Sequence, residues 1–237
     1  MSRKSNVMLE RFFTALISGD RAAVREVFDE LFEADVPAER IVDHLVWPAL
    51  DQIQQRVGSD QLSHLSHHFA TRLMRMMADQ LQLRYTQQAR RDQRVLVITG
   101  SDDAEELAGQ LAADLLEADG YTVQYAGGGV ANDEVVEQIG RADIDRLVVF
   151  GSTPSTVPAT RQLIDRLHGM GVCPKMQIVV GGGVFNRAEG LAEEIGADLW
   201  ASDPISLVKV MAENTQRRMS DDQRTVGRRR SKASKAA

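Results

Sequence analysis

The first third of the chain carries apolar residues at helical spacing. Val24, Val27 and Phe28, for example, recur three and four residues apart and so fall on one face of a helix. Residues 58–60, Gly-Ser-Asp, interrupt the pattern before a last long amphipathic segment. The spacing predicts four helices with short connections over residues 5–88, which is typical of an antiparallel bundle.

From Arg94 onward the pattern changes to short apolar runs separated by amphipathic segments. The runs are Val95–Ile98, Thr122–Tyr125, Leu147–Phe150, Ile178–Val180 and, more weakly, Asp198–Trp200. Continuous apolar strands between helices indicate a parallel sheet covered on both faces. We therefore predict an α/β fold class: after the bundle, a flavodoxin-like, doubly wound five-stranded parallel sheet of order 2-1-3-4-5 over residues 94–216. Ligands of such domains bind beyond the carboxyl ends of the strands.

The charge distribution separates a third segment, residues 217–237. It holds eight basic residues against two acidic ones, a balance of +6, so residues 1–216 carry −12 of the net charge of −6. We interpret the segment as a disordered, solubilising tail. The alternative is a basic arm that contacts a protein or the phosphates of a nucleic acid without sequence preference.

Two further properties limit the class of protein. No apolar run approaches the length of a membrane span and the first residues are polar, so we expect a cytoplasmic protein without a membrane partner. The single cysteine, Cys173, excludes an intramolecular disulfide and any multi-cysteine metal site.

The order of a helical bundle, a charged linker and a five-stranded α/β domain resembles a known family. It resembles the cobalamin (B12)-binding pair of methionine synthase, corrinoid methyl carriers and B12-dependent light- or redox-responsive regulators, over roughly residues 10–210. In that family an Asp-x-His-x-x-Gly motif follows the first strand. Counting back from the Asp119-Gly120-Tyr121 turn places residues 103–108, Asp-Ala-Glu-Glu-Leu-Ala, on that motif.

The resemblance implies roles for several residues of the α/β domain. Asp103 keeps the family's aspartate, whereas Glu105 stands where the family has the histidine that coordinates cobalt from below. A carboxylate is a harder and weaker axial partner than imidazole, so Glu105 is only a weak candidate metal ligand. After the third strand, Phe150 and Ser152 fall on the two positions that line the slot for the nucleotide tail. Gly181-Gly182 matches the slot's glycine pair.

The bundle carries the second part of the resemblance. Regulators of this family have a Trp, nine residues and then Glu-His, the Trp ring covering the corrin. Val57 takes the Trp position and His68 keeps the histidine. Trp47 is out of register, and we interpret it as a bundle core residue. His64 and His68, at i and i+4, have the spacing to chelate a divalent metal, but the sequence shows no third or fourth ligand.

Three functions follow from these patterns. The first is a non-enzymatic sensor or regulator that holds a corrinoid between bundle and α/β domain without the usual lower-ligand histidine, a loss that leaves base-on binding or no corrinoid at all as the alternatives to base-off binding. A heme, with His68 or Glu105 as axial group, is the alternative ligand. The second is a scaffold that contacts a protein or nucleic acid through the basic tail. The third is the corrinoid carrier of a methyltransferase.

Overall fold

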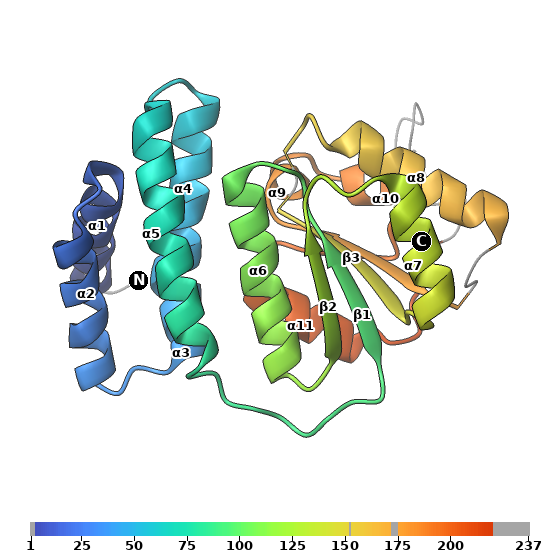
Figure 1. Ribbon diagram of the computed structural model, residues 1–237, viewed down its shortest axis with the longest axis horizontal. Helices are drawn as coiled ribbons and strands as arrows, with labels where there is room; N and C mark the ends of the chain where they lie inside the picture. Colours follow the sequence, from blue (N-terminus) through green and yellow to red (C-terminus); the bar gives the residue numbers. More distant parts are fainter. Residues whose placement is uncertain (1–2, 152, 172–174, 220–237) are drawn as a thin grey trace, which may run out of the picture.

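The computed structural model describes residues 3–151, 153–171 and 175–219, which form a helical bundle beside an α/β domain (Figure 1). The bundle's helices are α1 (Arg3–Ser18), α2 (Arg21–Glu33), α3 (Ala38–Ile41), the π-helical segment η1 (Val42–Val46), α4 (Trp47–Gly58) and α5 (His64–Gln82). The Asp20 carboxylate caps α2 by accepting the N–H groups of Ala22 and Ala23, both at 3.0 Å. The Ser63 hydroxyl caps α5. These two polar caps fix the residues at which α2 and α5 begin.

The third helix of the bundle, which the sequence predicts as one element from Pro37 to Val57, contains a π-helical segment. Here α3, η1 and α4 follow one another without a turn, and the N–H of Trp47 bonds to the carbonyl of Val42, five residues earlier. Pro48 has no N–H to donate, and its ring disturbs the hydrogen bonds of the preceding turn. A π-helical turn accommodates that disturbance without ending the helix.

The α/β domain contains one sheet of five parallel strands in the order β2-β1-β3-β4-β5, which confirms the predicted fold class and strand order. The strands are β1 (Arg94–Ile98), β2 (Thr122–Gly127), β3 (Arg146–Phe150), β4 (Gln177–Gly181) and β5 (Leu199–Ala201). The helices are α6 (Asp103–Ala118), α7 (Asn132–Ala142), α8 (Val157–Met170), α9 (Val184–Arg187), α10 (Leu191–Ile195) and α11 (Pro204–Glu213).

Helix α6 is the element that joins the two parts. It lies between the sheet and the bundle, with α5 along its outer side (Figure 1). Between its ends, almost every residue is buried. A helix that is buried nearly all round must be covered on both of its sides, and α6 meets this condition through β1, β2 and β3 on one side and α5 on the other.

The linker between the bundle and β1 is held against the end of α6. The N–H of Gln88 bonds to the carbonyl of Ala118 at 2.7 Å, and the N–H of Arg91 bonds to the carbonyl of Gly120 at 2.7 Å. Arg91 also pairs with Asp119, with 2.7 Å between guanidinium and carboxylate. The charged linker therefore fixes the bundle to the α/β domain at the amino edge of the sheet.

The start of the segment assigned to the tail is packed on the domain. The carbonyl of Arg217 accepts a hydrogen bond from the Gln177 amide at 2.9 Å, and the N–H of Met219 donates to the Asp198 carboxylate at 2.7 Å. Ser152, Cys173 and residues 220–237 lie outside the described residues. No helix in the described ranges is both long and apolar enough to span a bilayer.

Candidate functional site

The carboxyl edge of the sheet begins with the turn from β1 into α6, and Glu105 is its central residue. Asp102 caps α6 by accepting the N–H of Ala104 at 2.9 Å, and Glu105 returns the bond by accepting the N–H of Asp102 at 3.3 Å. This reciprocal pair is a capping box.

The Glu105 carboxylate also holds the loop that follows β3. It accepts the N–H of Thr153 at 2.6 Å and the hydroxyl of Thr156 at 3.2 Å. Only 2% of the Glu105 side chain is exposed. Buried carboxylates of this kind are held by charge-assisted bonds. Both of its oxygens are used within the protein, and the arrangement makes Glu105 a link between two loops rather than a group directed at a ligand.

Phe150, at the end of β3, covers the glycine pair that follows β4. A Cβ added to Gly181 would lie 2.5 Å from the Phe150 ring, and one added to Gly182 would lie 3.2 Å from it. Gly182 has φ of +65°, a conformation that L side chains rarely adopt. Glycine is therefore required at position 181 by the close approach of the Phe150 ring and of the Ala201 carbonyl, 2.6 Å from the same Cβ, and at position 182 by the backbone conformation.

Trp47 completes this apolar cluster from the bundle. Its ring centroid lies 5.8 Å from that of Phe150, in a tilted arrangement, and its far edge is 3.1 Å from a Cβ built on Gly182. Phe150 is fully buried and Trp47 is half-buried. The sequence interpretation of Trp47 as a bundle core residue is corrected here, because the ring reaches across to the α/β domain. We name Trp47, Phe150, Gly181 and Gly182 the aromatic plug.

The histidines at the start of α5 lie opposite the start of α6. His68 Nδ1 is 3.2 Å from the Asp103 carboxylate and His67 Nε2 is 3.9 Å from that of Asp102. His67 is buried, whereas the His68 side chain is 55% exposed. Val57, in the last turn of α4, is half-buried against the bundle core. Two residues that the resemblance places at the site, His68 and Asp103, thus contact each other at the junction of the two domains.

A row of polar contacts continues this junction along α5 and α6. Arg75 meets Glu106 at 3.3 Å, and the Gln110 amide donates to Asp79 at 2.8 Å. Within the described ranges, no group of three or more metal-ligating side chains occurs here or elsewhere. The contacts are partly exposed, so they orient the two helices more than they stabilise them.

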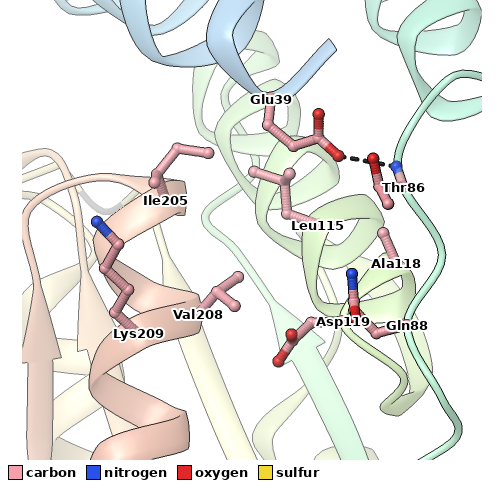
Figure 2. A pocket seen from close by; sticks show the side chains of 9 residues that line it. All are labelled: Glu39, Thr86, Gln88, Leu115, Ala118, Asp119, Ile205, Val208 and Lys209. Carbon is pink, nitrogen blue, oxygen red and sulfur yellow. Dashed lines mark hydrogen bonds between the residues drawn. The ribbon is translucent and has the colours of Figure 1, made fainter. Parts of the chain in front are cut away.

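A cavity of about 200 Å³ lies at the other end of α6, between the bundle, the linker and α11 (Figure 2). Glu39 and Thr86 close one side of it through a hydrogen bond of 2.8 Å, and Ile205 and Val208 of α11 form the apolar opposite side. Leu115 and neighbouring residues of α6 form its floor. It lies at the amino edge of the sheet, away from the residues that the resemblance selects.

Comparison with known families accounts for both parts of this architecture. Residues 8–82 match one B12 binding domain model, and residues 93–209 match a second B12 binding domain model. The chain belongs to the B12-binding domain family. Cobalamin is accordingly the cofactor that this family membership supports.

A solved structure of a corrinoid protein shows the same fold. The monomethylamine corrinoid protein of Methanosarcina barkeri superposes with a TM-score of 0.75 at 18% identity, over 88% of this chain and 99% of that one. A cobalamin-binding protein of Desulfitobacterium hafniense DCB-2 has 18% identity over 88% and 97%, with a TM-score of 0.47. A search of curated protein sequences gives no significant match.

The B12-binding domain of this chain does not offer the family's lower-ligand geometry. Glu105, which the resemblance places at the histidine position, has its carboxylate bonded to Thr153 and Thr156. Phe150 lies over the glycine pair at which the resemblance places the nucleotide tail. The residues on this edge therefore do not fit cobalt coordination from below by the protein, nor a tail inserted beside Gly181.

Proposed function

We propose that the chain is a non-enzymatic B12 sensor or regulatory module that binds cobalamin in base-on form. In base-on cobalamin the lower cobalt ligand is the cofactor's own benzimidazole, so the protein supplies no axial nitrogen. The corrinoid would bind at the junction formed by His68 and Asp103, with Val57 on the bundle side. Ligand binding there changes how the bundle packs on α6, and this change is the signal.

The observation that carries the proposal is that both carboxylate oxygens of Glu105 already accept hydrogen bonds within the protein. To ligate cobalt, the carboxylate would have to leave the N–H of Thr153, which it accepts at 2.6 Å and which would lose its acceptor; the Thr156 hydroxyl would keep the carbonyl of Thr153, 2.9 Å away. A donor left unsatisfied in a buried site costs about 1–3 kcal/mol. A weak oxygen ligand does not offset such a loss. The aromatic plug supports the same conclusion, because the tail of a base-off cobalamin would have to displace the ring of Phe150.

The experiment is a titration of the full-length protein with hydroxocobalamin, methylcobalamin and adenosylcobalamin, followed by absorption and by co-elution in gel filtration. Binding without conversion to a base-off spectrum is expected. For the reduced cob(II)alamin complex, the nitrogen splitting in the electron paramagnetic resonance spectrum is expected to stay the same when the protein carries ¹⁵N-histidine. A changed splitting would show that a protein histidine ligates cobalt, and failure of all three cobalamins to co-elute would reject the function.

A pair of variants tests the reason for base-on binding. Glu105→His alone places imidazole at the family's ligand position but leaves Phe150 over the glycines, and we expect the spectrum to stay base-on. Glu105→His combined with Phe150→Ser also opens the slot, and we expect part of the bound cobalamin to become base-off with a histidine-derived splitting. If the single variant converts fully, the aromatic plug does not control the binding form.

Signalling requires that cobalamin changes the contact between bundle and α6. Hydrogen exchange of α5 and α6 should therefore differ between free and cobalamin-bound protein, while exchange of the distant α7 stays constant. If cobalamin binds without changing the hydrogen exchange of α5 or α6, a corrinoid carrier would describe the protein's function better than a sensor.

A second function, corrinoid carrier of a methyltransferase, is supported by likeness of fold to the Methanosarcina barkeri corrinoid protein. In the family's pattern, a carrier controls the reactivity of cobalt through an axial ligand that the protein supplies. Glu105 does not provide such a ligand. The ¹⁵N experiment separates the two, because only the carrier requires a protein nitrogen on cobalt.

A parallel titration with hemin tests heme as the alternative ligand. Electrophoretic shift assays with and without residues 220–237, at two salt concentrations, test a nucleic-acid partner.

A further inference from the structure

The helical bundle contains an apolar cavity of about 310 Å³ between α1, α2 and the segment from α3 to η1. Most of the side chains that line it are apolar: Met8, Leu31, Val36, Ile41 and Leu45. Ile41 and Leu45 are 2% and 4% exposed, whereas the other three are only partly buried. The cavity therefore presents apolar surface that a ligand can reach from outside, and its volume lies at the lower end of the range of small-molecule sites.

One wall of the cavity is held in place by the end of α2. The N–H of Val36 bonds to the carbonyl of Leu31 at 3.0 Å, and the N–H of Asp35 bonds to the carbonyl of Phe32 at 3.1 Å. Asp35 itself has a φ of +51°. These bonds form a Schellman motif, in which the residue after the left-handed position packs against the last turn of the helix. Leu31 and Val36 thus form one apolar wall that is in place before a ligand binds.

Another wall of the cavity comes from the irregular part of the third helix. Ile41 is the last residue of α3, and His44 and Leu45 belong to the π-helical segment η1. Short π-helical turns inside α-helices are frequent at functional sites. The irregular turn and the cavity thus coincide, and this coincidence is an observation independent of the cavity's volume and lining.

Two polar side chains, Arg40 and His44, complete the lining, and both are accessible to solvent. Within the described residues, the Arg40 side chain has no ion-pair or hydrogen-bond partner, whereas His44 Nδ1 lies 3.5 Å from the Asp43 carboxylate. Among the described residues that line the cavity, none is acidic. A guanidinium can donate two parallel hydrogen bonds to one carboxylate. The lining therefore matches a molecule with an apolar body and a single carboxylate at one end.

We propose that this cavity is a second ligand site, which binds a free medium-chain carboxylate such as octanoate. The alkyl chain packs on the partly buried Met8, Leu31 and Val36, and the carboxylate accepts hydrogen bonds from the Arg40 guanidinium. None of the residues that line the cavity belongs to the aromatic plug or to the contacts between α5 and α6. The site is therefore distinct from the proposed corrinoid site, and the proposal does not depend on cobalamin.

The test is isothermal titration calorimetry of the full-length protein with octanoate, hexanoate, acetate and 1-octanol. Each buried methylene contributes about fourfold in affinity, so hexanoate, which is two methylenes shorter, should bind about fifteenfold more weakly than octanoate. Acetate should not bind. The neutral 1-octanol has the same chain length, and because it lacks the partly exposed ion pair it should bind about fivefold more weakly than octanoate.

Three variants assign the two parts of the ligand to the cavity. Arg40→Ala should weaken octanoate binding about fivefold and leave 1-octanol binding unchanged. The control is Arg141→Ala, which removes an exposed arginine from the last turn of α7 and should bind like the parent protein. Val36→Phe places a larger side chain in the cavity from the connection between α2 and α3, and it should abolish binding of both ligands.

Circular dichroism shows whether Val36→Phe keeps its helices, and the exposed Arg40→Ala keeps the test decisive if it does not. Absence of heat with octanoate at millimolar concentration would overturn the proposal. Equal affinities for octanoate and hexanoate would overturn it too, because the chain would then not be buried. Equal octanoate affinity of Arg40→Ala and the parent protein would contradict the assigned carboxylate contact, and unchanged binding in a folded Val36→Phe variant would place the ligand outside this cavity.

Discussion

Asp114 gives the most direct test of how α6 is held between its neighbours. It lies in the second half of α6 and is 8% exposed, and within the described residues its Oδ2 atom has no hydrogen-bond partner. Burial, and then the charges of Glu117 and Asp79, raise the pKa of Asp114 from 3.8 to about 7. The hydroxyl of Tyr85, at the start of the linker, is buried and likewise has no partner in the described part of the chain.

The raised pKa predicts the direction of a pH effect on stability. Below pH 3.8 the carboxyl is protonated in both folded and unfolded chains and has no effect. Between pH 3.8 and about 7 the unfolded chain releases its proton while the folded chain keeps it, so the free energy of unfolding falls as the pH rises. The loss is complete above pH 7, where the difference in pKa corresponds to about 4 kcal/mol.

Asp114→Asn keeps the shape of the side chain and removes its ionisation. The variant should therefore be more stable than the parent protein at pH 8, by up to about 4 kcal/mol, and similar to it near pH 4. Urea unfolding followed by circular dichroism at several pH values measures the difference. Glu137→Gln is the control, because Glu137 is an exposed carboxylate on α7 that is not among the groups acting on Asp114, and its loss should have a small effect. Parallel stability curves for Asp114→Asn and the parent protein across this pH range would refute the reasoning.

Three more substitutions test the carboxyl edge and the domain junction. Phe150→Ala removes a fully buried ring and should lower the free energy of unfolding by about 3–5 kcal/mol, measured by urea unfolding, and it should alter the fluorescence of Trp47. Glu105→Gln replaces a buried acceptor of two loops with a group that also presents donors, and a loss of about 1–3 kcal/mol is expected in the same assay. Arg75→Ala breaks a partly exposed pair with Glu106, so its cost should stay below about 1 kcal/mol and should shrink further in high salt; a larger loss would assign the junction a stabilising role.

The elements of this fold could be predicted from local patterns, because a strand buried on both faces needs a continuous apolar run. Val95–Ile98 and Leu147–Phe150 are such runs, and both are strands. The π-helical segment at Val42–Val46 was not predicted. A proline within a helical pattern indicates a disturbance, but Pro48 alone does not show whether the helix kinks, ends or adds a residue to one turn.

The site was only partly accessible to sequence reasoning, since its contacts join distant segments. Alignment to the family's motif selects Glu105, but its role depends on Thr153, which is 48 residues away in the chain. Trp47 was assigned to the bundle core because helical spacing reports which face is apolar and not which neighbour covers it.

The two departures from the family pattern at the carboxyl edge are physically linked. Glu105 can be buried because the loop after β3 gives it two donors, and that loop begins directly after Phe150. The same arrangement places the Phe150 ring over Gly181 and against Trp47. Restoring imidazole at position 105 would remove the acceptor that holds the loop, and opening the slot at position 150 would remove the bundle's contact with β3. A change in cobalt ligation therefore has to change both sites at once, and for this reason we expect only the double variant to shift the bound cobalamin toward the base-off form.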